Sequence, residues 1–112
     1  MTSAAEDFFA RVITDRLKLD LLCYFHRNPF TIDYAHGTAQ RLGADVQLVT
    51  RSLEELVQAG VLNVRQSQFD PSRPAVYSYT RNPEIRALVE EVVVQATTEE
   101  GRNQLLQRIA QK

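Results

Sequence analysis

The feature that most constrains this chain is a very short junction between two helical patterns. Before the junction, Ala35, Ala39 and Leu42 recur at the spacing of one helical face. Gly43 follows them, and Asp45 is a residue type that caps the start of a helix. A longer apolar stripe then begins, again with helical spacing: Val49, Leu53, Leu56 and Val57. Because glycine adopts positive φ at little cost, the sequence predicts two helices that meet at a steep angle over a tight turn.

A β-hairpin is predicted directly after these helices. The second helix should stop at Ala59 and Gly60, since glycine is common just past a helix C-terminus. Residues 61–65 and 75–80 alternate as strands do, whereas residues 66–74 between them are polar and contain two prolines. This pattern indicates two strands joined by a long tip, with Tyr77 and Tyr79 on the inner side of the second strand.

The N-terminal part is predicted to be helical. Ser3 and Glu6 have the spacing of a capping box. Helix continues to about His26, either as a second helix or after a bend near Thr14 and Asp15. The apolar positions that support it are Phe8, Phe9, Val12, Ile13, Leu17, Leu21, Leu22 and Phe25. Since so many apolar residues cover this second part, we expect it to pack on more than one side, as a central helix does.

Further elements lie on either side of the helix pair and hairpin. Residues 30–32 are expected to be extended, with Asp33 capping the helix that follows. Asn82 and Pro83 indicate the start of another helix, and a final amphipathic helix is expected after Gly101. The apolar positions of these C-terminal helices are Ile85, Leu88, Val89, Val92, Val93, Ala96, Leu105, Leu106 and Ile109.

Composition places the chain among single-domain globular proteins. It has 112 residues, of which 44% are hydrophobic and 24% charged. The one cysteine, Cys23, cannot form an internal disulfide and is expected to be a buried small hydrophobe, which suits the cytoplasm. His26 and His36 are isolated, so no metal or other cofactor is predicted. The sequence contains no nucleophile motif, phosphate-binding glycine loop or paired acid/base carboxylates, and therefore no enzyme activity is predicted.

No membrane association is predicted either. Glu6 and Asp7 in the first residues argue against a secretory leader, which begins with cationic residues followed by an apolar stretch. No apolar stretch approaches the roughly 20 residues that span a bilayer.

The order of predicted elements is that of a winged helix-turn-helix, a mainly α (α+β) fold with a two-stranded wing and flanking helices. Residues 42–62, from the Leu-Gly turn through the Thr50–Arg51 pair to the Ala-Gly-Val-Leu ending, resemble the MarR-like and ArsR-like transcriptional regulators. The resemblance extends over residues 31–80, a little under half of the chain. We therefore divide one domain into four parts: residues 1–28, N-terminal helices; 31–60, helix-turn-helix; 61–80, wing; and 82–112, C-terminal helices.

The resemblance implies duplex DNA as a partner and transcription regulation as a function. On the outer side of the second helix, Gln47 and Arg51 have the amide and guanidinium groups that form paired hydrogen bonds with adenine and guanine. Thr50 could contact a phosphate or a thymine methyl group. Arg65 and Arg73 on the hairpin are candidates for phosphate or minor-groove contacts, and Arg41 completes the candidate set: Arg41, Gln47, Thr50, Arg51, Arg65 and Arg73.

The alternative is an interaction module that docks a protein partner and binds no DNA. Residues 31–82 contain five arginines and five acidic residues, so this region has no net charge. Val46 and Leu48 are apolar where such regulators have small polar residues, and Glu54 and Glu55 would repel phosphate. Winged helices serve both functions. A third reading, a ligand-sensing regulator with a pocket beside the terminal helices, has no residue signature.

Several residues have a structural reading beside the functional one. Arg51 could pair with Glu54 or Glu55, and Arg73 could be a solvated loop residue. Phe69 in the hairpin tip is expected to pack back onto the body. The terminal helices have more apolar surface than one small domain should cover, which favours a homodimer formed through them; alternatively, they fold back and complete the core of a monomer.

Overall fold

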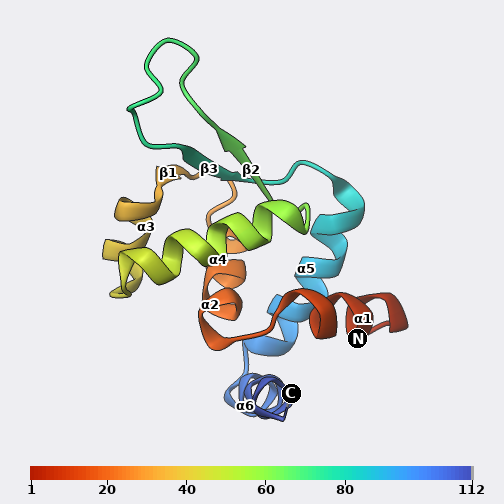
Figure 1. Ribbon diagram of the computed structural model, residues 1–112. Helices are drawn as coiled ribbons and strands as arrows, with labels where there is room; N and C mark the ends of the chain where they lie inside the picture. The colour runs from red at the N-terminus through yellow and green to blue at the C-terminus, as the bar shows by residue number, and fades with distance from the viewer. Residues whose placement is uncertain (112) are drawn as a thin grey trace.

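The computed structural model describes residues 1–111. Within them the chain is mainly α-helical, with a small three-stranded antiparallel sheet of order β1-β3-β2 (Figure 1). This is the predicted α+β, winged-helix type of fold. The elements are α1 (Ser3–Val12), α2 (Arg16–Arg27), β1 (Ile32–Tyr34), α3 (Ala35–Leu42), α4 (Val46–Gln58), β2 (Leu62–Arg65), β3 (Val76–Tyr79), α5 (Pro83–Ala96) and α6 (Glu99–Ala110).

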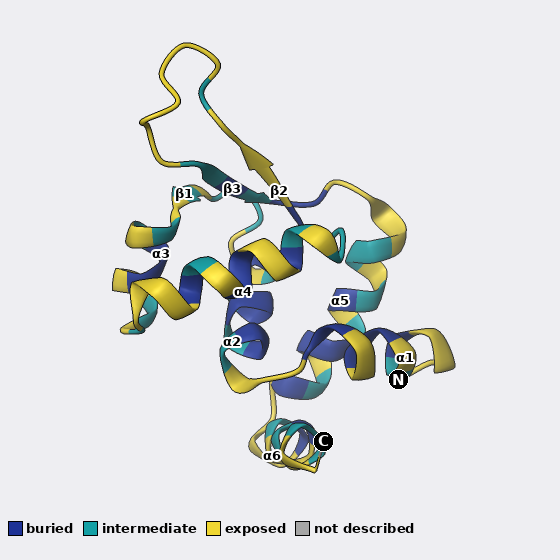
Figure 2. Ribbon diagram, viewed as in Figure 1, coloured by how far each residue is buried: buried dark blue, intermediate teal, exposed yellow. Residues whose placement is uncertain are grey.

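Helix α2 is the central element, as its apolar sequence predicts. It packs against α4, α5 and β3, and Figure 2 shows dark blue, buried residues along much of it. Its fully buried side chains are Leu19, Leu21, Leu22 and Phe25. Cys23 is also buried, as expected, and this burial raises the pKa of its thiol.

The sheet has β3 in the middle and two outer strands. Tyr77 and Tyr79 point into the core and are buried, whereas Ser78 between them lies on the outer face, opposite Ile32 and Asn63. The predicted wing is thus present, with β1 added as a third strand. This strand lies two residues further along the chain than the sequence predicts, because residues 32–34 are the ones that pair with β3.

Asp33 therefore does not cap α3, contrary to expectation. It lies within β1, where its carboxylate accepts a hydrogen bond from the Tyr34 amide at 2.8 Å. Tyr34 occupies the N-cap position of α3 without a side-chain hydrogen bond.

The start of α1 also differs from the prediction. Thr2, not Ser3, is the N-cap: its hydroxyl accepts from the Ala5 amide, and its own amide donates to Glu91 on α5 at 2.8 Å. The Ser3–Glu6 capping box is therefore wrong, because a tertiary contact with α5 favours the earlier residue. Between α1 and α2, Asp15 caps a new helix by accepting from the Lys18 amide, so the two are separate helices.

Helix α6 begins before Gly101 rather than after it. Thr98 caps the helix and accepts from the Gly101 amide at 3.0 Å. Gly101 is buried, and a Cβ at this position would overlap the carbonyl oxygen of Gln95 at the end of α5. Glycine thus permits the close approach of the two C-terminal helices.

The terminal helices cover much of their apolar surface within one chain. Phe8, Phe9 and Ile13 are buried, as are the inward residues of α5 and Leu105 of α6. Two ion pairs join α6 to the N-terminal helices: Arg102 to Asp20 at 2.5 Å, and Arg108 to Glu6 at 2.6 Å. The terminal helices thus complete part of the core within one chain, while Val94 on α5 stays 60% exposed. Across residues 1–111, no helix has the length and apolar character needed to cross a membrane.

Candidate nucleic-acid interface

The turn between α3 and α4 has the predicted geometry. Gly43 ends α3 in the left-handed conformation, with φ of +63°, and its amide donates to the Gln40 carbonyl at 3.3 Å. Asp45 caps α4 by accepting from the Leu48 amide at 3.0 Å. At the far end, Gly60 also has a positive φ and ends the helix. The turn and the residues at the two ends of α4 therefore determine how this helix is oriented against the core.

Helix α4 has one buried face and one solvent face. Val49, Leu53 and Leu56 are fully buried against the core. Gln47 and Arg51 are exposed on the opposite side. These two side chains are therefore accessible to a ligand along the first half of the helix.

Thr50 is half-buried beside them. Its hydroxyl donates to the Val46 carbonyl of the same helix at 2.8 Å. The proton of this hydroxyl is thus used within the helix, and Thr50 offers a ligand its methyl group and an oxygen lone pair.

The acidic residues on α4 do not neutralise Arg51. Within residues 1–111, Arg51 forms no ion pair, so the expected alternative pairing with Glu54 or Glu55 is wrong. Glu55 pairs instead with Lys18, a buried lysine of α2 whose ammonium also donates to Thr14 at 2.7 Å. This contact ties α4 to the central helix.

The wing arginines differ in their surroundings. Arg65 at the end of β2 is exposed and has no ion pair with the described residues, whereas Arg73 lies 3.8 Å from Asp70, between Nε and Oδ2. Gln66 donates to the Arg73 carbonyl at 2.6 Å across the tip. The tip is therefore held by hydrogen bonds of its own while Arg73 remains exposed.

Phe69 does not pack onto the body, contrary to expectation. It is 97% exposed, and the loop between β2 and β3 projects well beyond the helices (Figure 1). Because the loop extends away from the core, the ring stays in contact with solvent.

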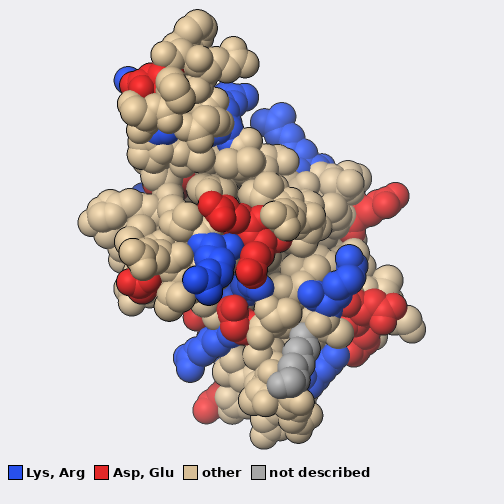
Figure 3. Space-filling model, viewed as in Figure 1, with Lys and Arg blue, Asp and Glu red and all other residues tan. Residues whose placement is uncertain are grey.

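The candidate cations do not form one continuous basic surface. Arg41 of α3 has its Nε 3.4 Å from Asp33, so two of the four candidate arginines, Arg41 and Arg73, have acidic neighbours. On the face seen in Figure 3, acidic and basic atoms are intermixed over the helices, and the wing has both signs. Contacts with DNA would therefore depend on individual side chains rather than on a broad positive field.

Two arginines, Arg81 and Arg86, were missed by sequence patterning as candidate site residues. The outer face of the sheet has hollows lined in part by Arg65, Arg81 and Arg86. Arg86 stacks on Tyr79, with its guanidinium carbon 4.8 Å from the ring centre, while burial raises the pKa of Tyr79 to about 12. Arg86 is fifty-four residues from Ile32 in sequence and lies on α5, so it is the tertiary structure that brings these two residues to one hollow.

Comparisons with known proteins support the fold. No protein-family model and no curated protein matches the chain. Among solved structures, a possible transcriptional regulator from Methanosarcina mazei Go1 is similar, with a TM-score of 0.62 and 21% sequence identity. The match covers 89% of this chain and 84% of that one. At this level of identity the likeness concerns the fold.

Proposed function

We propose that this protein is a cytoplasmic transcriptional regulator that binds duplex DNA through α4 and the wing. The observation that supports this best is the position of Arg51: exposed, without an ion pair in the described chain, on a helix whose opposite face is fully buried. The name of the Methanosarcina mazei structure, a possible transcriptional regulator, agrees with this function.

In the proposed complex, the exposed face of α4 lies in the major groove. Arg51 forms a bidentate hydrogen bond with guanine and Gln47 with adenine, while Thr50 contacts a thymine methyl group. Arg65 and Arg73 contact phosphates or the minor groove beside the recognised base pairs.

The acidic neighbours of Arg41 and Arg73 do not prevent this. Both ion pairs are exposed, and such pairs contribute roughly 0–1 kcal/mol each. A phosphate is a stronger hydrogen-bonding partner for a guanidinium, so these side chains can exchange one partner for the other on binding.

A homodimer formed through the terminal helices is part of the proposal. Two recognition helices set about one DNA turn apart would match palindromic half-sites. Val94 on the outer side of α5 is 60% exposed and is the apolar residue we place at the centre of such an interface.

Fluorescence anisotropy with a random-sequence duplex tests DNA binding. We expect binding at low salt that weakens as salt rises, because each phosphate contact releases counterions. The double variant Arg51→Ala, Arg73→Ala should bind about tenfold or more weakly, with a smaller salt slope. Arg16→Ala, an exposed arginine at the start of α2, is the matched control and should bind as the wild type does. Absence of binding at low salt would refute the proposal.

The second candidate function is a protein-docking module. It is favoured by exposed apolar side chains at the start of α4: Val46, and Leu48, which is 52% exposed. If this function is correct, no duplex binding is seen at low salt, and Leu48→Glu abolishes partner binding that Arg51→Ala leaves intact. Leu48→Ala also separates the two functions, since it should leave DNA affinity within about threefold if α4 reads base edges through Gln47 and Arg51.

A further inference from the structure

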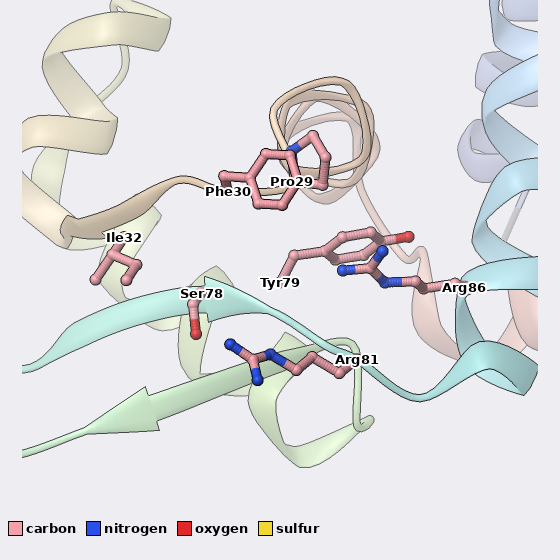
Figure 4. A pocket seen from close by; sticks show the side chains of 7 residues that line it. All are labelled: Pro29, Phe30, Ile32, Ser78, Tyr79, Arg81 and Arg86. Atoms are coloured by element: carbon pink, nitrogen blue, oxygen red, sulfur yellow. The ribbon is translucent and has the colours of Figure 1, made fainter.

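The outer face of the sheet is concave and accessible. Two adjoining hollows, of about 410 and 530 Å³, share Ile32, Ser78 and Arg81. Figure 4 shows the first, with Phe30 and Pro29 on one side, Ser78 on β3, Arg81 on the segment that follows it, and Arg86 on α5 beside the ring of Tyr79. Tyr79, on which Arg86 stacks, also lines the first hollow, and of the candidate DNA-contacting residues only Arg65 lines either hollow.

Apolar side chains on this face are unusually exposed. Phe30 is 94% and Ile32 is 70% exposed, although the chain buries most of its other large apolar residues. Exposed apolar groups gathered beside a hollow are typical of sites that another molecule covers.

The charged side chains of this face have one sign. The residues that line the two hollows include Arg65, Arg81 and Arg86 and no aspartate or glutamate. Arg86 is held in place, since its Nε donates to the Thr80 carbonyl at 2.7 Å and its guanidinium stacks on Tyr79. Glu90, one turn further along α5, forms no ion pair with it within the described residues. This uniform sign contrasts with the mixed charges elsewhere on the molecule.

We propose that this face binds an extended, acidic segment of a partner protein. Carboxylates of the segment pair with Arg65, Arg81 and Arg86, and an apolar side chain between them covers Ile32 and Phe30. Guanidinium groups bind carboxylates in a bidentate manner, and the unpaired backbone groups at the outer edges of β1 and β2 are available to an extended chain.

A protein segment fits this face better than a single-stranded nucleic acid. The aromatic residues that line the two hollows are Phe30 and Tyr79, and Tyr79 is buried with Arg86 stacked on its ring, so one exposed ring is present. Sequence-tolerant binding of single strands depends on aromatic side chains on which successive bases stack. An aliphatic side chain of a peptide, by contrast, packs directly against Ile32.

The test uses the full chain and a fluorescein-labelled peptide in which glutamates alternate with leucines. We expect saturable binding that Arg81→Glu weakens about tenfold or more, because this change replaces an attraction by a repulsion. Ile32→Ser should weaken it as well, whereas Arg16→Glu, the same charge change at an exposed site on α2, should leave it unaltered. Circular dichroism of each variant checks that the fold is retained.

Three results would overturn the proposal. These are no binding of the acidic peptide, equal binding of a peptide that alternates lysine with leucine, and a wild-type affinity in the Arg81→Glu variant. Binding of an oligothymidylate that is lost in Arg81→Glu, without binding of the peptide, would assign the face to nucleic acid instead. Because Arg51→Ala removes α4 contacts only, it should not change peptide binding, so this test and the duplex-DNA test can fail independently.

Discussion

Lys18 is a single residue that holds α4, the helix of the proposed interface, against α2. Its side chain is only 8% exposed, and its ammonium has two described partners, Glu55 and Thr14. A buried charge is tolerated when it is paired and hydrogen-bonded, and it becomes costly when one partner is removed.

We therefore predict that Glu55→Ala lowers the free energy of unfolding by about 1–3 kcal/mol, because it leaves a buried ammonium with Thr14 alone. Lys18→Met, which removes the charge and keeps the volume, should cost less. Urea denaturation measures both, with Glu54→Ala as the control, since Glu54 is exposed and has no ion pair among the described residues. A Glu55→Ala value equal to that of Glu54→Ala would show that the pair does not stabilise the fold.

Two glycines determine how elements join, for different reasons. Gly43 has a φ of +63° with open space around it, so glycine is required there by the backbone conformation and not by a neighbouring atom. Gly101 has an ordinary helical backbone, and glycine is required there because the Gln95 carbonyl leaves no room for a Cβ. The first supports the angle between α3 and α4, and the second supports the packing of α6 on α5.

Alanine substitutions should distinguish the backbone requirement at Gly43 from the steric requirement at Gly101. Gly43→Ala is expected to lower the free energy of unfolding by about 1–2 kcal/mol, the usual cost of a side chain in the left-handed region. Gly101→Ala should cost more than Gly43→Ala, since relief of the overlap requires α6 to move away from α5. Thermal unfolding followed by circular dichroism tests this order, and the reverse order would contradict the packing of α6.

At the scale of the whole molecule, the proposed homodimer predicts the mass of the protein in solution. Most apolar residues of the terminal helices are buried within one chain, so a dimer must use what remains exposed, with Val94 on α5 at its centre. We predict that sedimentation equilibrium gives the mass of two chains, and that Val94→Asp shifts it to one, since a buried carboxylate without a partner is costly. Leu48→Asp on α4, outside the terminal helices, is the control and should not change the mass. A single-chain mass for the wild type would exclude the homodimer.

Sequence patterning located the helix pair, the wing strands and most helix boundaries because those features are local. Gly43, Asp45 and Asn82 act on their immediate neighbours, and the buried stripe of α4 follows directly from its 3.6-residue period. Sequence patterning was wrong where a residue distant in sequence determines a cap, a strand or an ion pair. Thr2 caps α1 while bonded to Glu91, Asp33 is drawn into a strand by β3, and Glu55 pairs with Lys18 rather than with Arg51.

The amino-acid sequence by itself determined the class of fold and the residues on the outer face of α4, because period, caps and turns are encoded within a few residues of each other. Only the tertiary structure decided which arginines have acidic neighbours and how far the terminal helices cover one another. It also decided that Phe30, Ile32, Arg81 and Arg86 line one hollow. The physical reason is that these properties depend on pairs of residues far apart in the chain, whose meeting is set by strand register and helix packing rather than by local pattern.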